Sequence, residues 1–332
     1  MSTSSRFPLL KLPSLAQETV VNMLYPEVII DLCFHSNIFK SLLTTIKWKI
    51  DSFEWILTGN NIGITINSNF RSWGIRIQPD CTFKTEQKNL NGTTVSLAKH
   101  NCPFGGLMWF LVPETKNFNQ KLKNLEILTK FLMSFVKCSK FKLEYSMEKN
   151  LISRRFFIWN YLKGNSLNLE ISGNRMVPLR MTPDELEYIL SFENLVKLNI
   201  DVEVTDSNFK YQKILKAKEL VIRNSSWLDL KFVNCERLDL VRNFEKANEA
   251  LKLWIQGASL ENLEFLSIDY PNNIEQNEIL KDLKHQDTRF SNEELIKLIG
   301  ILLQGTVFRD IQRESDGLET GKLEELSSGD ED

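Results

Sequence analysis

The stretch Leu195-Val196-Lys197-Leu198-Asn199-Ile200 decides the fold class of this chain. Its pattern is an apolar residue, two variable positions, a second apolar residue, one variable position and an aliphatic residue. Alternation of this kind is typical of a strand that is buried on one face. We therefore expect Leu198 and Ile200 to face a core, with Lys197 and Asn199 on the opposite, exposed face.

The same spacing recurs along the second half of the chain. The other copies are Cys138/Phe141/Leu143, Ala217/Leu220/Ile222, Cys235/Leu238/Leu240, Leu263/Leu266/Ile268 and a degenerate Leu167-Asn168-Leu169-Glu170-Ile171. Leucine-rich repeats place one such strand in each unit of roughly 20–29 residues, and stacked units share a core. The uneven spacing of these copies leaves a second interpretation open, because any strand-helix-strand protein yields some such strings.

Helical segments lie between the strands. Leucine and phenylalanine recur at helical spacing from 122 to 135, and Thr182-Pro183-Asp184-Glu185 has the residues of a helix start, with Thr182 as N-cap. Residues 48–112 are strand-like, with turn signals between alternating runs. The predicted fold is mixed α/β: an N-terminal helix cluster, then an irregular leucine-rich-repeat-like arc of strands and helices.

The N-terminal segment has more apolar positions than a helix cluster of its size can bury. Leu12-Pro13-Ser14 precedes a first apolar helix, in which Ser14 and Gln17 fit a capping box. Tyr25-Pro26 ends that helix and begins the next. About 40 residues cannot form a full core alone, so we expect a partner to cover one face. An ordinary helical cap on the repeat arc is the alternative.

These residues resemble the F-box motif. Its leucine-proline start, helix residues, second proline and late serine-aromatic pair are matched without a gap. The matching residues are Leu12, Pro13, Val20, Val21, Leu24, Pro26, Ile29, Leu32, Ser36 and Phe39. The opening Phe7-Pro8-Leu9-Leu10-Lys11-Leu12-Pro13 is similar to nematode F-box proteins. Trp254-Ile255-Gln256-Gly257, residues 263–268 and Leu283-Lys284-His285 resemble their type 2 F-box-associated domain.

The resemblance implies domains and a function. It implies an F-box at 6–47, a strand-rich first part of the arc at 48–120 and a leucine-rich-repeat-like F-box-associated domain at 121–312. The implied function is substrate recognition in an SCF-type (cullin-RING) ubiquitin ligase, in which the F-box binds the Skp adaptor and the C-terminal domain binds a target protein. The expected adaptor-binding residues are Leu12, Pro13, Val20, Leu24, Pro26, Ile29, Leu32 and Ser36.

Strand alternation predicts where a target protein would bind. The variable positions of the repeated strings belong to the exposed face of their strands. They are Lys197, Asn199, Glu219, Val221, Arg237, Asp239, Phe265 and Ser267. Plain solvent exposure is the alternative for these side chains.

The chain departs from the F-box pattern at four positions. The family often has acidic residues where this chain has Leu15 and Val28, and a lysine where it has Asn37. His35 stands where an aliphatic residue is usual. These differences keep the apolar face of the helices, and weaker adaptor binding is left open as an alternative.

Candidate catalytic and metal-binding residues are few, so we expect no enzyme and no cofactor. The chain has three histidines and five scattered cysteines without short metal-binding spacing. His100-Asn101-Cys102 is the only close His/Cys pair, and such pairs arise readily by chance. No phosphate-binding glycine loop or zinc-protease motif is present.

Charge is unevenly distributed although the net charge is only −2. The segment 116–163 has eleven Lys/Arg against three Glu, interleaved with aromatic residues. This pattern leaves nucleic-acid binding as the alternative function, and the solvated face of amphipathic elements as the plain explanation.

The C-terminal segment and the hydropathy indicate the compartment. Residues 313–332 are acidic and lack aromatic residues, so we expect a disordered tail. No apolar run approaches the roughly 18 residues of a membrane span, and the first residues lack the apolar core of a signal peptide. We expect an intracellular protein, cytoplasmic or nuclear.

Overall fold

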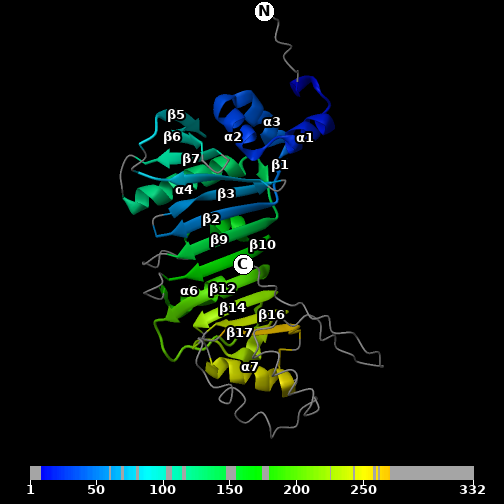
Figure 1. Cartoon of the computed structure of the whole chain (residues 1–332), viewed down its shortest axis with the longest axis vertical. Coiled ribbons are helices and arrows are strands. Elements are labelled where there is room, and N and C mark those ends of the chain that lie inside the picture. Colours follow the sequence, from blue (N-terminus) through cyan, green and yellow to red (C-terminus); the bar gives the residue numbers. More distant parts are fainter. Residues whose placement is uncertain are drawn as a thin grey trace, which may run out of the picture.

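The structure, a computed structural model of the 332-residue chain, has a mixed α/β fold. It describes residues 9–59, 61–68, 71–79, 82–101, 107–113, 117–146, 155–173, 179–224, 226–241, 244–256, 259–260 and 262–269. Cys102 and the whole segment after residue 269, with His285 and the predicted tail at 313–332, lie outside these residues. Figure 1 shows the strands stacked in one long ladder, with α1–α3 near one end and α7 near the other.

Three short helices form the N-terminal cluster. They are α1 (Ser14–Met23), α2 (Pro26–His35) and α3 (Asn37–Ile46), preceded by the 3-10 turn η1 (Leu9–Lys11). Pro26 begins α2 as predicted, because its fixed φ suits a first helical position. The capping box predicted at Ser14 and Gln17 is wrong: the N-cap is Pro13, which has no side-chain donor or acceptor, and Ser14 already lies inside the helix. Ser36 instead caps α3, accepting a hydrogen bond from the Phe39 backbone N–H at 3.1 Å.

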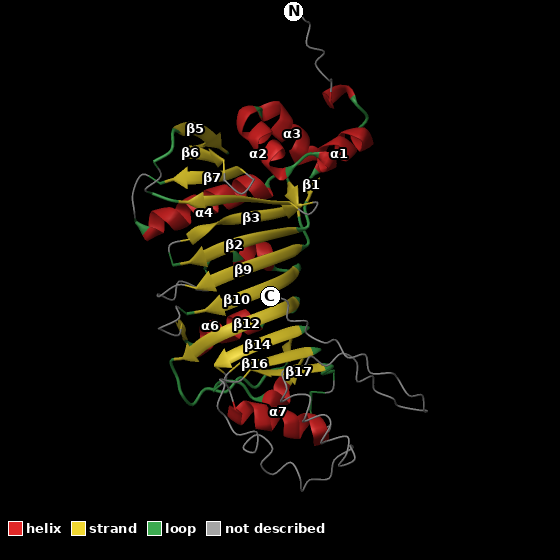
Figure 2. Ribbon diagram, in the orientation of Figure 1, coloured by secondary structure: helices red, strands yellow, loops and turns green. Residues whose placement is uncertain are grey.

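Most strands belong to a single thirteen-stranded sheet (Figure 2). One part contains mostly antiparallel neighbours: β3 (Asn61–Ser68), β4 (Arg71–Ile77), β7 (Leu107–Val112), β6 (Thr93–Asn101) and β5 (Thr85–Leu90). Within this part, β4 and β7 run parallel. The strand β2 (Ser52–Thr58) joins this part to the rest, pairing antiparallel with β3 and parallel with β9.

The other part of the sheet is parallel and contains the repeated strings. Its strands follow chain order: β9 (Lys140–Ser146), β10 (Ser166–Ser172), β12 (Leu195–Val204), β14 (Glu219–Asn224), β16 (Arg237–Val241) and β17 (Phe265–Asp269). Leu198, Leu220, Leu238 and Leu266 are aligned in register across four strands, and all are buried. The predicted alternation at Leu198 and Ile200 is therefore confirmed, since both side chains are fully buried.

Short strands flank the ladder. The strands β1 (Trp48–Lys49) and β8 (Val136–Lys137) pair with each other, as do β13 (Leu215–Lys216) and β15 (Val233–Asn234). The strand β11 (Leu179–Met181) pairs with the end of β12. A second 3-10 turn, η2, spans Leu230–Phe232.

Four further helices accompany the sheet. They are α4 (Phe118–Met133), α5 (Trp159–Leu162), α6 (Pro183–Leu190) and α7 (Phe244–Gln256). The indole Nε1 of Trp55 donates a hydrogen bond to Thr129 Oγ1 at 3.0 Å, which joins β2 to α4 inside the core. The helix start predicted at Thr182 is confirmed, with a complete capping box to Glu185. Helix α4 contacts β3, β4 and β5, whereas α7 contacts η2 near the last strands.

Candidate functional site

The N-terminal helices carry an unusual amount of exposed apolar surface. Among the described residues, eight large hydrophobic side chains are exposed, and six of them lie between residues 15 and 38. The six are Leu15 (75% exposed), Met23 (77%), Tyr25 (49%), Val28 (39%), Leu32 (38%) and Ile38 (65%). We call these six side chains the helical patch. Soluble proteins seldom expose clustered apolar side chains without a binding role.

The underside of the same helices is firmly packed on the sheet. Val21, Ile29, Ile30 and Leu43 are completely buried. Phe34 makes aromatic contacts with Trp109 of β7 at 5.1 Å and with Phe131 of α4 at 5.4 Å between ring centroids. The helical patch thus belongs to a cluster that its own chain holds in place, and its Tyr25 ring centroid lies 4.1 Å from the Arg71 guanidinium of β4.

The expected adaptor-binding residues divide into three groups. Leu32 and Pro13 are exposed, while Leu12, Val20, Leu24 and Ser36 are half-buried. Pro26 and Ile29 are buried against their own chain, and their contact with a partner stays a prediction. Both shape the surface from below. The motif could not separate these cases, because inner and outer faces of a small helical cluster are both apolar.

Three members of the helical patch, Met23, Tyr25 and Ile38, were not predicted from the sequence. Helical spacing places Met23 and Ile38 on an apolar face of the helices. It cannot show which apolar face the rest of the chain covers, because both faces have the same sequence pattern. The departures Leu15 and Val28 also belong to the patch. Where F-box proteins often have acids, this chain therefore presents apolar side chains to solvent.

The expected target-binding residues all lie on the face of the parallel strands opposite to the buried Leu198, Leu220, Leu238 and Leu266. They are neighbours in register: Lys197 pairs with Glu219 and Glu219 with Arg237, while Val221 pairs with Asp239. Lys197 Nζ lies 3.0 Å from Glu219, and the Arg237 guanidinium lies 3.1 Å from Asp239 and 4.2 Å from the centroid of the Phe265 ring. Asn199 and Ser267 stand in the next row of the same face. The structure therefore brings these residues together, but many of their charges already pair with one another.

A denser charge cluster lies on this face near the centre of the sheet. Lys142 Nζ lies 2.6 Å from Glu54 and 3.4 Å from Glu144. Burial disfavours the Lys142 ammonium, but the hydrogen bond to Glu54 and the nearby carboxylates outweigh it and raise the pKa of Lys142. Burial lowers the pKa of Arg76, against the pull of Glu54 and Glu144. The carboxylates therefore stabilise the Lys142 charge, whereas at Arg76 the effect of burial is larger than theirs.

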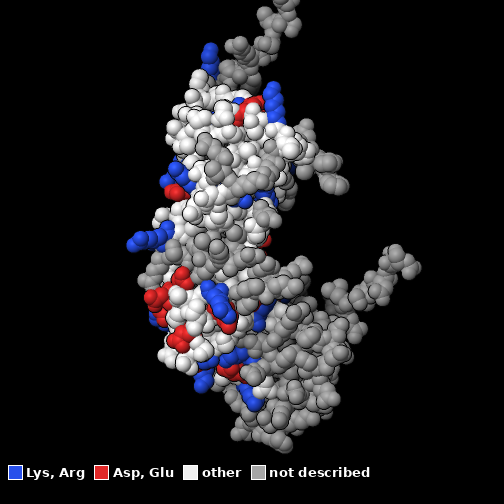
Figure 3. Space-filling view, turned by 90° about the vertical axis from the view of Figure 1, so that its left-hand side faces the viewer, with Lys and Arg blue, Asp and Glu red and all other residues white. Residues whose placement is uncertain are grey.

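Most aromatic side chains of the basic segment 116–163 are buried, and Phe118, Phe157 and Tyr161 are half-buried. Phe131, Phe141, Tyr145, Phe156 and Trp159 are buried in the core. Base stacking requires exposed rings, so these cannot serve it in this fold. Figure 3 shows Lys and Arg scattered among acidic and neutral residues on the face it views, with no continuous basic area among the described residues there.

Candidate catalytic groups are not arranged for chemistry within the described residues. His100 stacks on Phe83, with ring centroids 4.3 Å apart. Burial raises the pKa of the Cys33 and Cys235 thiols to about 12, which keeps both thiols protonated and poorly nucleophilic. The part of the chain that the structure describes contains no group of three or more His, Cys, Asp or Glu placed to hold a metal ion.

Comparison with known proteins identifies no relative. No family model, curated protein or solved structure matches this chain. Across the described ranges, none of the helices combines the length and the apolar character that crossing a membrane requires.

Proposed function

We propose that this chain is an F-box-type adaptor that presents a bound target protein to an SCF-type ubiquitin ligase. In this role the helical patch binds a Skp-type adaptor, and the repeat-like parallel strands, which we propose form a leucine-rich-repeat-like domain, bind the target. The chain contributes geometry, because holding the target near the conjugating enzyme raises the effective concentration of its lysines.

The observation that carries the proposal is the helical patch. Six exposed apolar side chains gather on the segment that resembles an F-box. Fully covering an aliphatic side chain is worth about 1.5–3 kcal/mol. A partner that covers even half of the patch therefore gains enough free energy for specific binding, which explains why a folded cluster leaves these residues outside its core.

The test uses charge insertion into the helical patch. Met23→Glu combined with Ile38→Glu places two carboxylates on the outer surface without touching the buried underside. Loss of two buried apolar contacts, at about 1.4 kcal/mol for each tenfold change, predicts at least about a 100-fold weaker association with the Skp adaptor. Isothermal titration with purified full-length chain measures this change.

The matched control is Ile214→Glu. Ile214 is 61% exposed and lies outside the helical patch, so the same chemical change there should leave adaptor affinity unaltered. Unchanged melting temperatures would show that both variants fold. Equal adaptor affinity of the double variant and the wild type would refute the proposal.

A further inference from the structure

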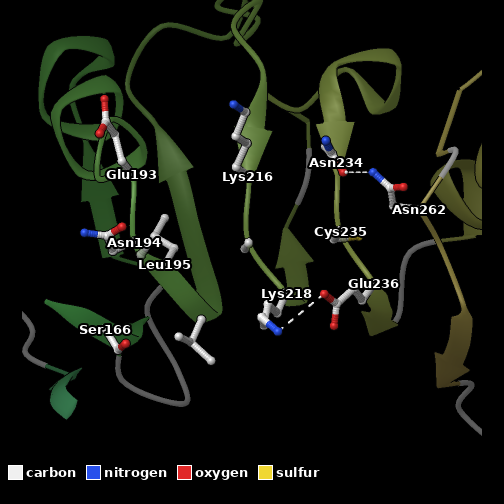
Figure 4. A pocket seen from close by; sticks show the side chains of 12 residues that line it. Ser166, Glu193, Asn194, Leu195, Lys216, Lys218, Asn234, Cys235, Glu236 and Asn262 are labelled. Carbon is white, nitrogen blue, oxygen red and sulfur yellow. Dashed lines mark hydrogen bonds and ion pairs between the residues drawn. The ribbon is translucent and has the colours of Figure 1, made fainter. Parts of the chain in front are cut away.

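A cleft of about 390 Å³, lined by both polar and apolar residues, lies where the parallel strands begin. Its lining comes from the residues just before, or at the start of, β10, β12, β14, β16 and β17 (Figure 4). We call it the strand-entry cleft. The cleft lies at one edge of the sheet, and its lining residues come much later in the sequence than the helical patch. Its volume lies in the range of ligand sites.

Side-chain amides occupy a recurrent position in this cleft. Asn194, Asn234 and Asn262 each immediately precede the first residue of a repeated string. Lys216 holds the same position before the string that begins at Ala217. It pairs in register with Asn234. Asn262 Nδ2 donates a hydrogen bond to Asn234 Oδ1 at 2.8 Å. A row of amides offers both donors and acceptors, which is also what an extended peptide backbone needs.

Two charges in the cleft are uncompensated. Lys218 lies 3.5 Å from Glu236, so these two charges offset one another. Within the described residues, Lys216 and Glu193 make no ion pair, and both are exposed. In Figure 4 their charged ends extend to the same side of the cleft, while Lys218 and Glu236 meet at the other side. The rim therefore presents one free cation and one free anion.

The spacing of these charges fits an extended chain. Lys216 is the last residue of β13, which leads into β14, and Glu193 lies just before β12. The strands β12 and β14 are adjacent, and neighbouring strands lie about 4.8 Å apart. Side chains two residues apart in an extended peptide point the same way and stand about 6.6 Å apart, given a rise of about 3.3 Å per residue. An acidic and a basic side chain in such a peptide can meet Lys216 and Glu193 together.

We propose that the strand-entry cleft binds an extended peptide segment that carries an acidic and a basic residue two positions apart. The asparagine row binds its backbone, and Lys216 and Glu193 select its side chains and its direction. The identification of this peptide as part of a ubiquitination target rests on the proposed function. Binding of the peptide itself does not.

The probe is a set of labelled synthetic nonapeptides in a Gly/Ser/Ala background. They carry Asp-x-Lys, Lys-x-Asp, Asp-x-Asp, Lys-x-Lys or neutral residues at the central positions. Fluorescence anisotropy with the full chain should show at least tenfold tighter binding of one mixed order than of the other. The double swap Lys216→Glu with Glu193→Lys should reverse that preference, because it exchanges the two charges and keeps the net charge.

A second swap is the control. Lys213 and Glu187 form an exposed ion pair at 2.6 Å outside the cleft lining, so Lys213→Glu with Glu187→Lys should preserve the wild-type preference. No binding, equal binding of both orders, or a preference that survives the cleft swap would overturn the proposal. Adaptor titration on the same samples separates the two hypotheses. If the protein selects the peptide but does not bind the adaptor, the proposed peptide site stands and the proposed ligase function is refuted.

Discussion

Gly63 shows how a single residue sets the surface of the sheet. A Cβ atom at Gly63 would lie 2.3 Å from the backbone oxygen of Ile75 and 3.0 Å from Cδ of Arg76. The missing side chain lets β4 approach β3 closely and lets the Arg76 side chain lie across the strand. The charge cluster around Glu54 and Lys142 therefore depends on a glycine on the neighbouring strand.

Gly63→Ala should lower the free energy of unfolding by about 1–3 kcal/mol, since a backbone oxygen cannot easily move out of the way. Gly74→Ala is the control on the paired strand, where the nearest atom to a new Cβ is 3.6 Å away. That change should leave the free energy of unfolding unaltered or raise it by about 0.4–1 kcal/mol, because alanine reduces the conformational entropy of the unfolded chain. Urea denaturation of both variants measures the difference, and equal stabilities would contradict this account of Gly63.

Helix starts show how local sequence sets the elements. Thr182 Oγ1 accepts a hydrogen bond from the Glu185 backbone N–H at 3.3 Å, and Glu185 Oε2 accepts one from the Thr182 N–H at 2.9 Å. Ser14, by contrast, lies in the first turn of α1, which has no side-chain cap. Similar residues at similar sequence positions thus play different roles in α6 and α1.

Thr182→Ala should lower the free energy of unfolding by about 0.5–2 kcal/mol, because the backbone N–H of Glu185 at the start of α6 then loses its hydrogen-bond acceptor. Ser14→Ala should change the free energy of unfolding by less than about 0.5 kcal/mol. Thermal melts of the two variants provide the comparison. A larger loss at Ser14 than at Thr182 would show that α1 is capped by its serine after all.

At the scale of the whole molecule, the two proposed binding surfaces belong to different parts of one continuous sheet. The helical cluster contacts β1 and the antiparallel strands, whereas the strand-entry cleft lies among the later parallel strands (Figures 1 and 4). Because one sheet connects them, binding at one surface keeps a defined position relative to the other. Such separation is what an adaptor between two proteins requires.

Nucleic-acid binding through the segment 116–163 should be weak and steeply salt-dependent, because the protein is not basic overall and most of the aromatic rings are buried. Lys123→Glu, Lys137→Glu and Lys140→Glu together alter exposed lysines and spare Lys142, which already pairs with Glu54. This triple variant should bind the Skp adaptor like the wild type. Sub-micromolar RNA or DNA affinity at physiological salt, lost in the triple variant, would favour the alternative function.

Local sequence patterns were sufficient to predict the mixed α/β class, the strands that contain Leu198, Leu220, Leu238 and Leu266, and the helix start at Thr182. These features follow from periodicity and capping, which depend on residues close together in the chain. Three features could be found only in the three-dimensional structure. Ile29 is buried while Ile38 is exposed, β7 lies between β4 and β6, and Glu193 and Lys216 line the same cleft. The physical reason is that burial and proximity depend on which distant segments cover a surface, and an apolar position has the same local pattern whether its own chain or a partner covers it.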